Sequence, residues 1–229
     1  MSRPLVLLSG FGAFERVRAN PSGALVRALA ARPPAGWRVA GVELPVSFAR
    51  APRVWDRRRS ALRGRPELFL ALGVSKEGTF RLERFGRPGL KRVARPDVDG
   101  ELAAAHSRPG PALETPLDLG AVARALRLRG LGPLRISRSC GGYVCERIYH
   151  HVLVRGRAQR VPALFLHVPP LAHVPLRRQE RFLRALLEEL LPAQGKGVRT
   201  RRGRASGSVG ARAAKARTAA RNGPSSRPM

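Results

Sequence analysis

PALFLHV, at residues 162–168, is a short apolar run that stops at Pro169-Pro170, as a buried strand does when the chain must turn. Two runs of the same kind lie earlier in the chain, PLVLLS at 4–9 and ELFLAL at 67–72, and a glycine follows each of them directly. Runs this short and this apolar are typical of buried strands, so we expect all three to form the centre of the fold.

Patterns with helical spacing separate these runs. Helices are expected from Asn20-Pro21-Ser22 to about Ala31 and over 47–63, 117–128, 142–155 and 176–191, with further strands over 37–43 and 134–137 and a strand or hairpin over 78–86. Asn20 or Ser22 could cap the first helix. Residues 87–115 are rich in proline, glycine and polar residues and predict a long loop. Strands that alternate with helices predict an α/β fold, here a single three-layer α/β/α domain with a mixed, mainly parallel sheet.

The charge of the chain is strongly positive. It carries 44 Lys and Arg against 15 Asp and Glu, a formal net charge of +29, and only four of the basic residues are lysine. Such an arginine excess is as typical of a GC-rich genome as of polyanion binding. Residues 193–229 hold ten basic residues, no acidic residue and no aromatic one. We expect a folded domain over 1–192 and a disordered tail over 193–229, either a solvated appendage or an arm that contacts nucleic acid.

The chain has no apolar stretch near the ~20 residues that a membrane-spanning helix needs, so no membrane association is expected. The first apolar run is too short for a signal peptide. The two cysteines, Cys140 and Cys145, are five residues apart and make neither a disulfide framework nor a metal-ligand pattern with the histidines. The simplest compartment for such a chain is a reducing cytoplasm.

Cys145 is the first candidate for chemistry. A glycine pair, Gly141-Gly142, permits a tight turn from the strand at 134–137 into the following helix, so that Cys145 lies in the first turn of that helix. The unpaired N–H groups and the positive dipole end of a helix start lower the pKa of a thiol and could hold an oxyanion. The alternative is that Cys145 is a small buried core residue, as most free cysteines are.

A base and an acid complete the set of candidates. His167 closes a buried run and would face a site at the carboxyl edge of the sheet, as a base or as a hydrogen-bonded structural histidine. His150 and His151 lie more than a turn beyond Cys145 on its own helix and are poor partners for its thiol. Glu83 and Asp97 could each orient the imidazole, and spacing does not choose between them.

Several segments, taken in order over residues 4–191, resemble the pyroglutamyl peptidase I family, the cysteine peptidases that remove an N-terminal pyroglutamate from peptides. The matching segments are LLSGFGAF at 7–14, Asn20-Pro21-Ser22, Leu44-Pro45-Val46, LALG at 70–73, Leu82-Glu83-Arg84, Pro96-Asp97 with Gly100, Gly141-x-Tyr-Val-Cys145 and Phe165-x-His167-Val-Pro169. Each segment is a weak signal by itself. Their common order, with all three catalytic residue types present, makes the resemblance specific.

The resemblance implies Cys145 as nucleophile, His167 as general base and Glu83 as the carboxylate partner of the histidine. The residues that it implies at the substrate site are Phe11, Phe14, Val144 and Asp97. It further implies a peptide substrate, no metal or other cofactor, and a homo-oligomer. Aromatic walls suit a flat, uncharged lactam ring, and a closed pocket would exclude a free ammonium group because an unpaired buried charge is costly.

Five positions depart from the family's pattern, and they are Ala13, Arg81, Val98, Cys140 and Glu146. Arg81 stands where a small hydroxyl residue is usual and Val98 where an asparagine is usual, so either could alter the loops around the pocket. Two alternatives to a peptidase therefore stay open. One is a diverged, inactive relative that binds peptide ends, and the other is a nucleic-acid-associated protein that acts through its basic tail.

Overall fold

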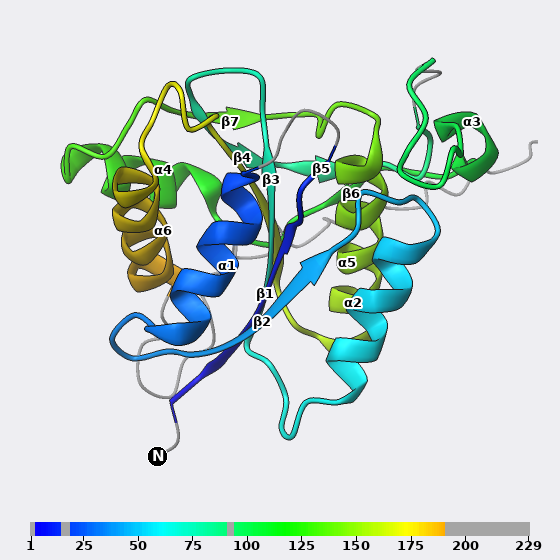
Figure 1. Cartoon of the computed structure of the whole chain (residues 1–229). Coiled ribbons are helices and arrows are strands. Elements are labelled where there is room, and N and C mark those ends of the chain that lie inside the picture. The colour runs from blue at the N-terminus through cyan, green and yellow to red at the C-terminus, as the bar shows by residue number, and fades with distance from the viewer. Residues whose placement is uncertain (1–2, 15–18, 91–93, 191–229) are drawn as a thin grey trace, which may run out of the picture.

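The computed structural model describes residues 3–14, 19–90 and 94–190 and has a central six-stranded sheet (Figure 1). The strands are β1 (Leu5–Phe11), β2 (Arg38–Leu44), β3 (Leu68–Val74), β4 (Phe80–Glu83), β7 (Leu134–Ser137) and β8 (Ala163–Val168), in the spatial order β2-β1-β3-β8-β4-β7. All neighbouring pairs are parallel except β4 with β8. The predicted mixed, mainly parallel sheet is confirmed.

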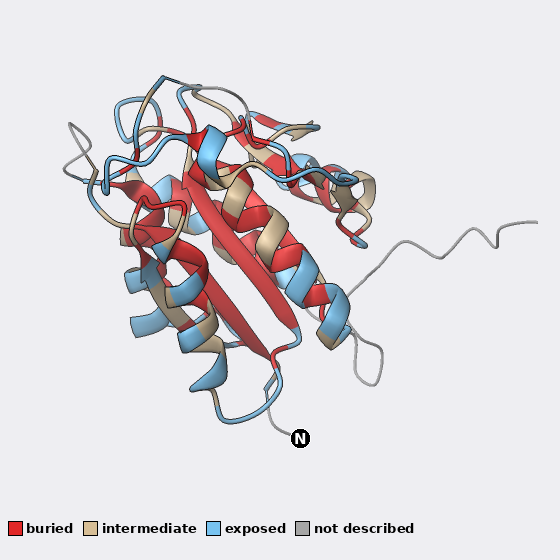
Figure 2. Cartoon of the chain, turned by 90° about the vertical axis from the view of Figure 1, so that its right-hand side faces the viewer, coloured by how far each residue is buried: buried red, intermediate tan, exposed pale blue. Residues whose placement is uncertain are grey.

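Helices cover both faces of the sheet and give the fold three layers. On one face lie α1 (Pro21–Ala31), α4 (Leu119–Leu128) and α6 (Leu176–Leu190), and on the other lie α2 (Arg50–Ser60) and α5 (Val144–Gln159) (Figure 1). Each face has its own apolar core. Figure 2 shows the buried strands between helices that expose only their outer sides.

The alternation of side chains along β8 determines which core each residue joins. Leu164 and Leu166 belong to the core beneath α1, α4 and α6, whereas Ala163 and Phe165 belong to the core beneath α2 and α5. Because successive side chains of a strand point to opposite faces, His167 faces the side of the sheet that carries α5. This placement brings the histidine to the face on which α5 begins.

Local signals in the sequence determine where α1 begins. Asn20 is the N-cap, its side chain accepts a hydrogen bond from the backbone N–H of Ser22 at 3.1 Å, and Pro21 is the first helical residue. Of the two predicted caps, Asn20 therefore holds this position. The other predicted helices and strands form with ends that differ from the prediction by a few residues.

The long loop predicted over 87–115 is wrong in part. This segment contains the short helix α3 (Ala103–His106) and the strand β6 (Leu113–Glu114), which pairs antiparallel with β5 (Phe85–Gly86). Ala103 is fully buried in the core beneath α5 and anchors the segment. The proline and glycine content predicts a loop, and it does not reveal either feature because each depends on a partner far away in the sequence.

The basic tail predicted over 193–229 lies outside the described residues, so the division into a domain over 1–192 and a tail stays a prediction. Across the described ranges, none of the helices is long and apolar enough to cross a membrane.

Candidate active site

Glu83 and His167 form a buried pair across two neighbouring strands. β4 runs antiparallel to β8 with Arg81 opposite His167 and Glu83 opposite Phe165, so these four side chains share one face of the sheet. His167 Nδ1 lies 2.7 Å from Glu83 Oε1, and the two side chains are 5% and 0% exposed. The contact orients the ring and leaves Nε2 as the nitrogen for proton transfer.

The Glu83–His167 pair has a defined charge state. Burial disfavours the Glu83 carboxylate, but the hydrogen bond and charge of His167, with further help from Ser137 and Arg81, hold the pKa of Glu83 below its usual value. Burial lowers the pKa of His167 although Glu83 opposes this, and the Arg81 cation lowers it further. At neutral pH the pair is therefore a carboxylate beside a neutral imidazole, which is the state that a general base needs.

Cys145 approaches this pair from the first turn of α5. The two preceding glycines, Gly141 and Gly142, have φ values of 96° and 76°, a left-handed region that favours glycine. The Cys145 sulfur lies 2.9 Å from the position that a Cβ on Gly73 would occupy. Gly73 is the register partner of His167. Thiol and imidazole therefore lie together at the carboxyl ends of β3 and β8.

The resting thiol of Cys145 is neutral. Burial raises its pKa to about 12, the charges of Glu83 and Glu146 raise it too, and Arg81 and the backbone N–H of Cys145 act in the opposite sense. The lowered pKa expected from the helix start is wrong for the resting molecule, because burial and two carboxylates outweigh Arg81 and the backbone N–H. A thiolate must therefore form by proton transfer during the reaction.

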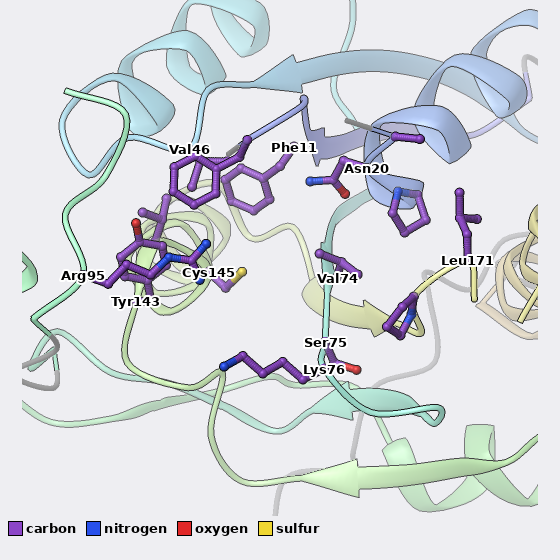
Figure 3. A pocket seen from close by; sticks show the side chains of 15 residues that line it. Phe11, Asn20, Val46, Val74, Ser75, Lys76, Arg95, Tyr143, Cys145 and Leu171 are labelled. Carbon is purple, nitrogen blue, oxygen red and sulfur yellow. The ribbon is translucent and has the colours of Figure 1, made fainter. Parts of the chain in front are cut away.

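A cavity of about 350 Å³ opens beside Cys145 (Figure 3). Its lining is mostly apolar and includes Phe11, Phe14, Val46, Val74, Tyr143, Val144, Pro170 and Leu171, together with the polar Asn20, Ser75, Lys76 and Arg95. Figure 3 shows the Cys145 sulfur with Tyr143 and Arg95 on one side and Val74 on the other. Three of the predicted substrate-site residues, Phe11, Phe14 and Val144, thus lie in the wall of one cavity.

Comparison with known proteins matches residues 5–185 to the model of the pyroglutamyl peptidase family. This chain belongs to the pyroglutamyl peptidase family. It is 32% identical over 193 residues to the pyrrolidone-carboxylate peptidase of Chromobacterium violaceum, and the aligned region covers 77% of this chain and 83% of that protein. It is 29% identical over 200 residues to pyroglutamyl-peptidase 1 of Rattus norvegicus, and the aligned region covers 82% of this chain and 90% of that protein.

Solved structures agree with this assignment. The crystal structure of the pyrrolidone carboxyl peptidase from Fervidobacterium islandicum superposes with a TM-score of 0.72 at 26% identity and covers 82% of this chain and 98% of that one. A mutant peptidase structure from Pyrococcus furiosus reaches the same TM-score at 20% identity and supports the fold. The predicted fold, the family resemblance and the prediction of a cysteine peptidase are confirmed.

Asp97, which the family resemblance implies at the substrate site, lies behind the pocket wall. Its Oδ2 accepts a hydrogen bond from the backbone N–H of Phe48 at 2.7 Å, and its Oδ1 accepts from two amides of its own loop at 2.9 and 3.0 Å. The Phe48 ring packs edge-on against Tyr143 with centroids 5.1 Å apart. The Tyr143 hydroxyl donates to the carbonyl of Pro96 at 2.7 Å. Asp97 thus supports the wall through Phe48 and Tyr143.

Two departures from the family pattern leave the pocket in place. Glu146, which is 1% exposed, accepts hydrogen bonds from the backbone N–H groups of Arg87 at 2.8 Å and Gly142 at 3.3 Å, and so it closes the glycine turn. Val98 points its side chain to solvent and donates its backbone N–H to the carbonyl of Val46 at 3.2 Å. A third departure, Ala13, is exposed.

Cys140 adds a second thiol near the Glu83–His167 pair. Ligand atoms of the three residues lie within 4.8 Å of one another, and all three residues are buried. Such a group could hold a metal ion, but the Arg81 guanidinium donates two hydrogen bonds to Glu83, at 2.9 and 2.8 Å, and already supplies a positive charge there. Burial raises the pKa of Cys140 well above its usual value, so this thiol is neutral.

Tyr143 and Arg95 are among the cavity residues that were not predicted at the site. Tyr143 lies within the matched nucleophile segment, so its place next to Val144 could have been inferred from that segment. Arg95 comes from the proline-rich loop, and its guanidinium lies 4.8 Å from the Phe14 ring centroid and 5.5 Å from that of Tyr143. No pattern in the sequence brings Arg95 to the site, because the path of the loop decides it.

Proposed function

We propose that this chain hydrolyses the amide bond that follows an N-terminal pyroglutamyl residue of a peptide. One observation carries the proposal, namely that the Cys145 thiol at the start of α5 lies against Gly73, the register partner of His167 in the buried Glu83–His167 pair, at the edge of an apolar cavity. The relatives named above support the substrate class, since their names give pyrrolidone-carboxylate or pyroglutamyl peptides as substrates.

The first chemical step forms an acyl-enzyme. Cys145 Sγ attacks the carbonyl carbon of the scissile amide while its proton passes to His167 Nε2, and Glu83 at Nδ1 stabilises the imidazolium that results. Negative charge develops on the carbonyl oxygen beside the first turn of α5, where the N–H groups of Val144 and Cys145 have no acceptor within the helix. The Gly142 N–H is bonded to Glu146 and is less suited to this role.

The remaining steps regenerate the thiol. His167 gives its proton to the leaving nitrogen as the carbon–nitrogen bond breaks, which leaves a thioester on Cys145. Water then loses a proton to His167 and attacks the thioester carbonyl, and pyroglutamate leaves as Cys145 regains a proton. In this route protein groups and one water molecule carry out every proton transfer. The expectation of no cofactor agrees with this route and stays a prediction.

The cavity explains why a pyroglutamyl end would be selected. Phe11 and Phe14 offer aromatic surface to a flat lactam ring, and backbone groups at the rim can read its amide. A free N-terminal ammonium would lose its hydration in this mostly apolar cavity, and none of the described residues that line it is acidic. The same pocket therefore rejects an uncyclised N-terminus.

Cleavage of a fluorogenic pyroglutamyl amide under reducing conditions tests the proposal. We expect turnover by the purified chain, no turnover of the matching prolyl amide, and loss of activity on treatment with iodoacetamide. Cys145→Ser should lower kcat/KM by at least about 10³-fold, whereas Cys140→Ser is the matched control and should keep activity. A folded, reduced chain that does not cleave the pyroglutamyl amide would contradict the proposal.

We also propose a reducing compartment, the cytoplasm, as the working environment. Cys140 and Cys145 are both free cysteines, and the reaction needs Cys145 as a thiol. A homo-oligomer and contact between the tail and nucleic acid stay predictions. Gel filtration with light scattering would test the former.

A further inference from the structure

Arg81 departs from the family pattern and contacts the Glu83–His167 pair directly. Its Nε and Nη2 atoms lie 2.9 and 2.8 Å from Glu83 Oε1. His167 Nδ1 lies 2.7 Å from the same oxygen. The Arg81 side chain is 13% exposed, so the contact is shielded from most of the solvent. One carboxylate oxygen thus serves both the cation and the imidazole.

The same guanidinium reaches three further groups. Nη2 lies 3.1 Å from the carbonyl oxygen of Ser139 and 3.5 Å from His167 Nδ1, and Nη1 lies 3.4 Å from Glu77 Oε1. Ser139 belongs to the turn that leads through the two glycines to Cys145. Arg81 therefore connects the carboxylate, the imidazole and the turn that positions the nucleophile.

We infer that Arg81 is a positioning residue, which holds the Glu83 carboxylate and the nucleophile turn in register and places a positive charge beside the His167 ring. The inference rests on the proposed function, because it assigns a role within that reaction. A small hydroxyl residue at position 81 could supply neither the fork of donors nor the charge.

The chemistry of guanidinium explains both effects. Its five donors lie in one rigid plane, so it can bind a carboxylate oxygen, a backbone carbonyl and a second carboxylate at once. Its charge beside the ring disfavours the imidazolium. Burial is the larger cause of the lowered pKa of His167, Glu83 opposes it, and Arg81 adds to it.

Other titratable and charged groups surround the site, and they are the same in each variant and in the parent with which it is compared. They are Glu83 on β4, Glu77 in the loop before β4, Cys140 in the turn before α5, and Cys145 and Glu146 in the first turn of α5. Arg81 is a cation that lies next to the His167 ring and lowers its pKa. Replacing Arg81 with methionine therefore removes one positive charge next to the ring and leaves the carboxylates in place.

The test is the pH profile of kcat/KM for a pyroglutamyl amide in Arg81→Met. Removing a positive neighbour favours the imidazolium, so a more alkaline solution is needed to reach the neutral base, and the acid limb moves to higher pH. Arg81→Lys keeps the charge without the fork, so we expect the acid limb near the wild-type position with a lower plateau. NMR titration of the His167 ring in a Cys145→Ala background should move in the same direction as the acid limb in Arg81→Met.

Arg135→Met is the matched control. Arg135 is the register partner of Arg81 on β7 and pairs with the same Glu77 at 2.5 Å, but its side chain is 52% exposed. This variant loses the same charge one strand further from His167, and its acid limb should not move. Should Arg81→Met fail to fold, Arg81→Gln carries the same expectation. An unmoved acid limb and an unmoved ring titration in a folded variant would overturn the inference, whereas a wild-type chain without turnover contradicts only the proposed function and leaves the titration to decide.

Discussion

Replacing Gly73 with alanine tests whether room on β3 sets the position of the nucleophile. A methyl group on Gly73 would lie 2.9 Å from the Cys145 sulfur and 2.8 Å from Cζ of Phe165. Ordinary carbon contacts lie at about 3.5–4.0 Å, so the sulfur, the ring or the strand must move by about 0.5–1 Å.

The Phe165 ring cannot absorb this movement alone. It is fully buried, and its centroid lies 5.6 Å from the Tyr149 ring and 4.8 Å from the His167 ring. If the ring moves, it displaces the imidazole, and if the sulfur moves, the distance between thiol and imidazole changes. A displacement of about 1 Å at reacting groups costs on the order of 10²-fold in rate. Overpacking should in addition lower the free energy of unfolding by about 1–3 kcal/mol.

The assay is kcat/KM on the fluorogenic pyroglutamyl amide together with urea unfolding of the same preparation. Gly89→Ala is the control, because a methyl group there meets the carbonyl oxygen of Arg108 at 3.7 Å, an ordinary contact. We expect this control to match the wild type in both measurements. A folded Gly73→Ala enzyme whose kcat/KM stays within about threefold of wild type would refute the reasoning.

Three further predictions follow from the same geometry and charges. Iodoacetamide should modify Cys145 rather than the buried Cys140, and the rate should still be rising at pH 10, because burial raises the pKa of Cys145 to about 12. A rate that reaches a plateau near pH 7, with the modified site mapped by mass spectrometry, would contradict this. Asp97→Ala should lower the free energy of unfolding by about 1.5–3 kcal/mol and raise KM more than it lowers kcat, since Phe48 loses its anchor; an unchanged KM with a lowered kcat would count against it. Truncation before residue 193 should leave kcat/KM unchanged and weaken salt-sensitive binding to duplex DNA, and equal binding by both forms would show that the tail is not the arm.

The sheet could be predicted from the sequence because its strands are local signals. The run at 162–168 forms β8, and the weaker run at 134–137 matches β7 (Leu134–Ser137). The pairing of β5 with β6 could not be predicted, since two residues on each side carry no periodicity. Ala103 likewise becomes a core residue only when the loop folds against α5.

The site residues also divide into those that local sequence signals predict and those that depend on distant pairing. Cys145 and His167 were candidates on local grounds, because a helix start and a strand end are visible in sequence. The choice between Glu83 and Asp97 depends on the register of β4 against β8, which places Glu83 on the face of His167. Sequence spacing does not predict that register, and the choice of Glu83 came from the family resemblance instead. Nor could spacing predict that burial would reverse the expected shift of the Cys145 pKa.

That reversal changes how the nucleophile should be understood. Burial is the largest cause of the raised pKa of the Cys145 thiol and of the lowered pKa of His167. A neutral thiol beside a neutral imidazole is therefore strongly favoured at rest over a thiolate beside an imidazolium. Thiolate formation is then coupled to attack, because the negative charge leaves the sulfur as it develops on the carbonyl oxygen beside the amides of α5. Oxidation and alkylation act on the thiolate, so a resting neutral thiol reacts more slowly in both. Arg81 contributes on the histidine side of this balance, and the glycine at position 73 contributes on the sulfur side by giving the thiol room next to the ring.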